Sequence, residues 1–202
     1  MILALDTSTA ACTAALLDGS GECVASRDEV IGRGHAERLV PMIAEMMEGR
    51  TADQILVGIG PGSFTGIRVG IAAAHGLAIG WNSELHGMSS LALIARGAQS
   101  EGEIAVAVIA GHGELFVQQF DGRTGRAIGE LLNLPPHAAA ARTNSRLVLG
   151  SGAAQLVQAR GWGDARERWP SAADALGLPE PLRSMAPKPV YARSPDAKAK
   201  AA

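Results

Sequence analysis

Ile2-Leu3-Ala4-Leu5-Asp6 opens the chain as a short apolar run, and a second apolar run covers 13–17. The turn-forming residues Asp18-Gly19-Ser20-Gly21 separate that run from a third expected strand, 22–28. An Asp-Gly pair between apolar runs is a strong hairpin signal, because both residues tolerate the backbone angles of a tight turn. The opening stretch therefore predicts a meander of three strands.

A helix, a buried strand and a second helix are expected next. Residues 35–48 carry apolar side chains at helical spacing, namely Ala36, Leu39, Val40, Ile43, Met46 and Met47. The run 55–59 is apolar enough for a buried strand. It ends in the turn Gly60-Pro61-Gly62-Ser63, and a second helix is expected over 65–79.

The same order of elements recurs in the second half of the chain. Strands are expected at 104–109 and 115–120, and Asp121-Gly122 takes the place of the earlier Asp-Gly turn. The run 147–152 leads into a helix over 153–160, as 55–63 leads into the helix over 65–79. We expect the stretch 132–145, with its two prolines and its alanine run, to replace the first helix of this half.

The doubled pattern is the layout of the actin-like ATPase and sugar-kinase superfamily. We therefore predict an α/β, two-lobe actin-like (ASKHA) fold built from duplicated βββαβα units, with a reduced second lobe. The expected boundaries are an N-terminal lobe over 1–97, a C-terminal lobe over 98–193 and a disordered tail over 194–202. A fold of this kind does not specify a function.

The composition is that of an ordinary globular protein, with 47% hydrophobic, 19% charged and only 3% aromatic residues. A protein that holds tRNA alone usually has a basic face, but the net charge here is −2 and the nearest basic cluster is Lys198 and Lys200. We therefore expect any nucleic acid to be bound mainly by a partner protein. The most apolar later run, 67–79, is too short to span a bilayer, so we expect a cytoplasmic protein without membrane contact.

The most specific feature is the motif at 60–70, Gly-Pro-Gly-Ser-Phe-Thr-Gly-Ile-Arg-Val-Gly. It joins a strand end, a tight turn and a helix start, where Ser63 or Thr65 could cap the helix and free N–H groups could hold an anion. The motif lacks the Gly-Lys-Ser/Thr of a phosphate-binding P-loop and the third glycine of a dinucleotide fingerprint. A purely structural turn and a phosphate cradle both remain open.

Asp6, at the end of the first strand, invites comparison with the aspartate that helps to bind Mg-phosphate in actin-like ATPases. Those enzymes usually have a glycine next, so that the backbone can approach the phosphates. Thr7 and Ser8 follow here instead. The sequence favours a strand-end turn capped by hydroxyl groups.

The motif at 60–70 resembles the signature of the TsaB (YeaZ) family. Further agreement lies in the opening run 2–8, in His35-Ala36-Glu37-Arg38-Leu39-Val40-Pro41, and in the closing Pro189-Val190-Tyr191-Ala192-Arg193. The resemblance covers 1–97 closely and the rest loosely. One departure is the loop 109–114, Ile-Ala-Gly-His-Gly-Glu, where many members have Asp-Ala-Arg.

The resemblance implies a non-catalytic scaffold that is required for threonylcarbamoylation of adenosine 37 in tRNA. It implies pairing with the catalytic relative TsaD, cooperation with TsaE, self-pairing through the same helices, and only indirect contact with tRNA. TsaD carries a His-x-Glu-Gly-His metal motif on its first helix. The matching positions here run from His35 to Leu39, and leucine is no metal ligand, so no metal site and no peptidase activity are expected.

The resemblance also places the partner surface on the two helices of the first lobe, although a wholly intramolecular core would explain the same pattern. The expected contact residues are Leu39, Val40, Met42, Ile43, Met46, Met47, Ile67, Val69, Gly70, Ala73, Ala74 and Leu77. No cofactor of its own is expected. ATP or ADP with Mg²⁺ would be bound by the complex, at a junction to which Ser63, Thr65 and Arg68 contribute.

Two alternatives stay open at this point. One is a small ATP-dependent kinase or carbamoyltransferase of the same fold, which would need a phosphate loop and a metal site. The other is a homodimeric regulator with a different partner.

Overall fold

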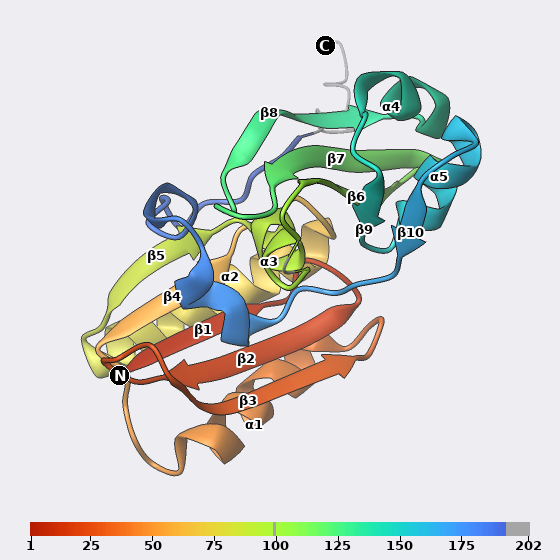
Figure 1. Cartoon of the computed structure of the whole chain (residues 1–202). Coiled ribbons are helices and arrows are strands. Elements are labelled where there is room, and N and C mark those ends of the chain that lie inside the picture. The colour runs from red at the N-terminus through yellow and green to blue at the C-terminus, as the bar shows by residue number, and fades with distance from the viewer. Residues whose placement is uncertain (99, 193–202) are drawn as a thin grey trace, which may run out of the picture.

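Two five-stranded mixed sheets organise the chain in the computed structural model, which describes residues 1–98 and 100–192 (Figure 1). The predicted tail, 194–202, lies outside the described residues. The first sheet has the strand order β3-β2-β1-β4-β5. Its strands are β1 Ile2–Asp6, β2 Ala11–Leu17, β3 Cys23–Val30, β4 Gln54–Gly58 and β5 Glu84–Met88.

The second sheet repeats this topology. Its order is β10-β9-β6-β7-β8, which matches the first sheet when it is read from the opposite edge. In both sheets the first strand pairs antiparallel with the second and parallel with the fourth. Its strands are β6 Glu103–Gly111, β7 Glu114–Asp121, β8 Ala127–Leu134, β9 Leu147–Leu149 and β10 Asp164–Arg166. The predicted two-lobe fold with a duplicated unit is confirmed.

The first lobe carries the longer helices, α1 His35–Met47 and α2 Phe64–Trp81, and the short α3 Ser90–Arg96. The second lobe has α4 Pro136–Arg142 and α5 Ala153–Arg160, and the 3-10 turns η1 Ala172–Gly177 and η2 Glu180–Leu182 follow. The expectation that 132–145 replaces a helix is wrong. A short helix is retained there, because Pro136 sits at a helix start, where its missing N–H costs nothing.

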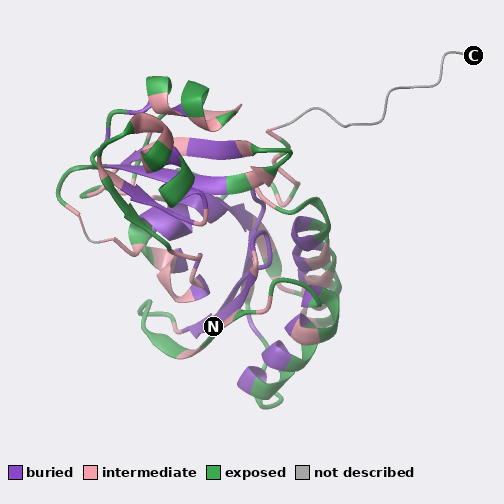
Figure 2. Ribbon diagram, turned by 90° about the vertical axis from the view of Figure 1, so that its right-hand side faces the viewer, coloured by how far each residue is buried: buried purple, intermediate pink, exposed green. Residues whose placement is uncertain are grey.

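Successive side chains of a strand point to opposite faces of the sheet, and this alternation divides the core into layers. Leu3 and Leu5 face α1 and α2, whereas Ala4 between them faces the opposite side. That opposite side packs on α3, η1 and the inner face of the second sheet, so a single core joins the two lobes. A separate cluster lies under α4 and α5. In Figure 2 the strands between these layers are largely buried, and the helices turn their exposed residues outward.

The C-terminal segment returns to the first lobe. The N–H of Ala172 donates to the hydroxyl of Thr13 at 2.8 Å, and the hydroxyl of Ser171 donates to Asp28 at 2.8 Å. Further on, the N–H of Val190 donates to the carbonyl of Ile59 at 2.9 Å. The expected boundaries assigned this segment to the second lobe. The structure corrects this, because an irregular segment carries no periodic pattern that shows which lobe it packs on.

Candidate functional site

The glycine-rich motif packs the start of α2 closely against the loop between β1 and β2, and hydrogen bonds hold the two together. The N–H of Ser63 donates to the carbonyl of Ser8 at 2.6 Å, and the hydroxyl of Thr7 donates to the carbonyl of Gly66 at 2.7 Å. A Cβ on Gly66 would lie 2.0 Å from the carbonyl oxygen of Thr7, and one on Gly70 would lie 2.5 Å from the Thr7 hydroxyl. The glycines are therefore required by close packing inside the chain, which favours the structural turn over the phosphate cradle.

Ser63 is the helix cap that the sequence allowed. Its hydroxyl accepts a hydrogen bond from the N–H of Gly66 at 3.2 Å. Thr65 is exposed on the first turn of α2 and does not line the neighbouring cleft. Of the three residues expected at a nucleotide junction, Ser63 and Arg68 lie together in that cleft and Thr65 does not.

Asp6 is enclosed by hydroxyl groups. Its Oδ1 accepts hydrogen bonds from the N–H and the hydroxyl of Ser8, both at 2.7 Å, and its Oδ2 accepts one from the hydroxyl of Ser90 at 2.5 Å. Complete burial raises the pKa of Asp6, and the hydrogen bonds from Ser90 and Ser8 act in the opposite direction. Because both carboxylate oxygens are used inside the protein, the arrangement matches the predicted capped turn and not an Mg-phosphate ligand.

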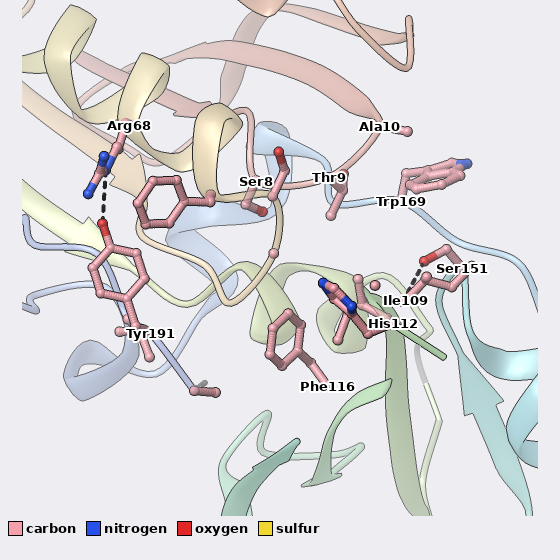
Figure 3. A pocket seen from close by; sticks show the side chains of 18 of the residues that line it. Ser8, Thr9, Ala10, Arg68, Ile109, His112, Phe116, Ser151, Trp169 and Tyr191 are labelled. Carbon is pink, nitrogen blue, oxygen red and sulfur yellow. Dashed lines mark hydrogen bonds between the residues drawn. The ribbon is translucent and has the colours of Figure 1, made fainter. Parts of the chain in front are cut away.

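A cleft of about 900 Å³ lies between the lobes and is the main candidate binding site (Figure 3). The first lobe contributes the loop after β1 and the start of α2, and the second contributes the β6–β7 turn. Aromatic residues are only 3% of the chain, yet several of them line this cleft, namely Phe64, Phe116, Trp169 and Tyr191. Such a volume and lining suit a small planar ligand.

Arg68 is held in place at one end of the cleft. Its Nε donates to the hydroxyl of Tyr191 at 3.1 Å, and its guanidinium carbon lies 3.6 Å from the ring centre of Phe64. The rings of Phe64 and Tyr191 are themselves 5.4 Å apart. The two ends of the family-like sequence, the glycine motif and the closing Pro-x-Tyr-x-Arg run, thus meet at this wall. Arg193 of that run lies outside the described residues.

The opposite wall is the loop that departs from the family pattern. Ile109 and His112 line it, and the N–H of Ile109 donates to the hydroxyl of Ser151 at 3.2 Å. Figure 3 shows Trp169 at the far end of the cleft from Arg68. Sequence reasoning missed Phe116, Ser151 and Trp169, because no motif or periodicity marks them. The scarcity of aromatic residues was the one signal that could have drawn attention to two of them.

The chemistry available in the cleft is limited. Arg68 and His112 are its basic side chains, and the described lining contains no carboxylate. In the part of the chain that the structure describes, no group of three His, Cys, Asp or Glu side chains could hold a metal ion. His35, in the place of the metal motif, is buried with its Nε2 3.2 Å from the carbonyl of Ala11. The cleft is suited to bind a planar group beside one guanidinium.

Most residues of the expected partner face belong to the core instead. The buried ones are Leu39, Met42, Ile43, Met46, Met47, Ile67, Gly70 and Ala74. Helical spacing shows which residues share a stripe but not which way it points, and the most apolar stripe here faces the sheet. The expectation is corrected for these residues. Val40 is exposed, and Val69, Ala73 and Leu77 are half-buried, so these four remain available.

The outer face of α2 is nevertheless apolar and uncovered. We define it as Val69, Ala72, Ala73, Gly76, Ile79 and Gly80, which share one side of the helix. Ile79 is 84% exposed, and a Cβ on Gly76 or Gly80 would meet no atom within 4 Å. Among residues 1–98 and 100–192, these two glycines therefore serve no packing, unlike Gly66 and Gly70.

The duplicated sheets and the cleft between them define the class, a two-lobe protein of the actin-like fold. The family model of TsaD, tRNA N6-adenosine threonylcarbamoyltransferase, matches residues 23–161. The solved structure of YeaZ from Pseudomonas aeruginosa is 32% identical with a TM-score of 0.77, covering 94% of this chain and 98% of that one. The chain belongs to the TsaB (YeaZ) family, within the wider group that the TsaD model describes.

Curated relatives support the assignment to the TsaB family. The tRNA threonylcarbamoyladenosine biosynthesis protein TsaB of Escherichia coli is 37% identical over 59% of this chain, and that of Haemophilus influenzae is 39% identical over 58%. The chain spans about half the length of these relatives, 54% and 52%. An uncharacterised protein of Mycobacterium tuberculosis H37Rv is 32% identical over 98% of this chain and 93% of its own length. Within the described residues no helix combines the length and the apolarity needed to cross a membrane.

Proposed function

We propose that this chain is the non-catalytic partner subunit in the formation of threonylcarbamoyladenosine in tRNA, that it pairs with TsaD, and that it works with TsaE. The observation that carries the proposal is the uncovered outer face of α2 in a member of the TsaB family. The names of the E. coli and H. influenzae relatives support the pathway.

The uncovered glycines support pairing through this face. A glycine inside a helix lowers stability by about 1 kcal/mol relative to alanine. Gly76 and Gly80 make no close contact with the described residues that would offset this loss. Small residues let another helix approach closely, and the exposed side chain of Ile79 would be buried by it. TsaD is the proposed occupant, because the family model that matches this chain is that of TsaD itself and paired subunits of related fold commonly use equivalent faces.

A non-catalytic role is consistent with the chemistry of the cleft. The alternative of an ATP-dependent kinase or carbamoyltransferase needs groups that hold Mg²⁺ and several phosphates. The oxygens of Asp6 are occupied by Ser8 and Ser90, and the described cleft lining offers one guanidinium and no carboxylate. We propose that ATP or ADP with Mg²⁺ is held by the complex, and that Arg68 lends its guanidinium at the junction.

The test is modification of an unmodified tRNA transcript by the reconstituted components, with and without this chain. We expect modification to collapse when only this chain is omitted, and we expect no activity from the chain alone. Modification that proceeds equally well without the chain would contradict the proposal, and would favour a homodimeric regulator with another partner. Activity of the chain alone would contradict the non-catalytic role.

A further inference from the structure

Arginines are concentrated in one segment of an otherwise acidic protein. The chain has a net charge of −2, but the segment 142–168 is basic. It contains two acidic residues, Asp164 and Glu167, and five arginines, at 142, 146, 160, 166 and 168. The fold brings four of these arginines and a tryptophan together at the edge of the second sheet. We call this set the β10 patch, and it consists of Arg142, Arg146, Arg160, Trp162 and Arg166.

Backbone contacts show that the members of the β10 patch are neighbours. Arg142 ends α4, and the next residue, Thr143, accepts a hydrogen bond from Nη1 of Arg160 at 3.3 Å. The N–H of Asp164 donates to the carbonyl of Arg146 at 2.9 Å. Arg166 lies two residues further along β10, on the same side of the strand as Asp164. Figure 1 shows α4, α5 and β10 close together at one end of the second lobe.

Trp162 presents a flat aromatic surface within the patch. Its side chain is 48% exposed, and the guanidinium of Arg160 stacks on its ring at 3.6 Å from the centre. The Nε of Arg160 also donates to the carbonyl of Trp162 at 3.2 Å, so this stacked pair is fixed before any ligand arrives. Arg146 is 81% exposed and is partly balanced by Asp164 at 3.0 Å. Arg142 and Arg166 are exposed as well.

We propose that the β10 patch binds RNA directly, with its exposed arginines on phosphate groups and an unpaired base stacked on Trp162. Guanidinium groups match phosphate oxygens in geometry and charge, and an exposed ring offers a stacking surface to a single-stranded base. An acidic protein would also be attracted by the arginines, and the binding assays below distinguish it from RNA because they use RNA alone as the probe. The proposal rests on the proposed function, which makes the RNA a tRNA, and it replaces the expectation of purely indirect contact.

Binding of a fluorescently labelled, unmodified tRNA transcript to the full chain tests the proposal by anisotropy at two salt concentrations. We expect Arg146→Ala/Arg166→Ala to weaken binding about tenfold and to reduce the salt slope by about 1.5–2, because two phosphate contacts are removed. Trp162→Ala should weaken binding of single-stranded oligouridine about fivefold or more, with a smaller effect on duplex RNA. The matched control is Arg27→Ala/Arg33→Ala, which removes two exposed arginines from the first lobe. Circular dichroism verifies that every variant is folded.

Equal affinity of the patch variant and the wild type, or an equal loss in the control variant, would overturn the proposal. In the reconstituted reaction, the patch variant should raise KM for tRNA and leave kcat unchanged. Failure of this inference is distinguishable from failure of the proposed function. If omission of the chain abolishes modification while the patch variant behaves as the control does, only the RNA contact is wrong.

Discussion

Arg68 donates a hydrogen bond from its Nε to the hydroxyl of Tyr191 at 3.1 Å, across 123 residues of sequence. Arg68 belongs to the glycine-rich motif and Tyr191 to the closing run of the chain, so the two most family-like segments form one wall of the interlobe cleft. The contact orients a guanidinium that also stacks on Phe64.

The first prediction concerns nucleotide binding by the proposed complex with TsaD. Arg68→Ala should weaken ADP binding about tenfold or more, because a hydrogen bond to a charged group contributes about 1.5–3 kcal/mol. Tyr191→Phe should cost less, since it removes only the hydroxyl that orients Arg68. Isothermal titration checks both, with Arg33→Ala as a control at an exposed site outside the cleft. An unchanged affinity in Arg68→Ala would remove this residue from the nucleotide site.

The second prediction contrasts two glycines of α2. Gly70→Ala should lower the free energy of unfolding by about 1–3 kcal/mol, because the new Cβ would press on the Thr7 hydroxyl. Gly76→Ala should raise it by about 0.5–1 kcal/mol, because its Cβ enters open space and alanine favours the helix. Urea unfolding of the chain measures both. Equal effects of the two substitutions would show that α2 is packed differently.

The third prediction distinguishes a core residue of α1 from an exposed residue on the outer face of α2. Ile79→Asp should leave the unfolding midpoint unchanged and abolish pairing with TsaD, because Ile79 is 84% exposed in the free chain. Ile43 is 2% exposed, so Ile43→Asp should prevent folding by burying an unpaired carboxylate. Light scattering coupled to size exclusion reports the pairing. Normal pairing by Ile79→Asp would move the interface away from this face.

The fourth prediction is a pH dependence due to Asp6. Burial raises its folded-state pKa above the ordinary value of 3.8, so the folded state holds the proton more tightly than the unfolded state. The resulting contribution to stability is complete below pH 3.8 and is lost as the pH rises through the folded pKa. Asp6→Asn cannot titrate, so its stability relative to the wild type should increase with pH over that window.

Urea unfolding of both proteins at a series of pH values measures this difference. Ser90→Ala is a useful companion, because it removes one donor to Asp6 and should raise its pKa further. A difference between wild type and Asp6→Asn that does not vary with pH would show that Asp6 keeps the same proton affinity in both states.

The sequence predicted the first lobe better than the second. The opening strand, the Asp-Gly turn and both long helices lie where expected, within a few residues. It gave no bounds for β8 and missed β5 and β10, which have weak patterns: β5 contains Glu84, His86 and Gly87, and β10 is Asp-Ala-Arg. These strands exist because a neighbouring strand offers hydrogen bonds along its edge, a cause that acts across the fold and not along the chain.

By itself, the sequence determined the local elements, the duplicated order and the family, because turns, helix periods and motif spacing depend on residues that are close along the chain. Only the tertiary structure decided that Ile43 faces inward and Ile79 outward, since spacing does not orient a helix. It alone brought Tyr191 against Arg68 across the length of the chain and gathered four aromatic residues around one cleft. Such groupings join distant segments through packing of whole layers, which no local pattern records.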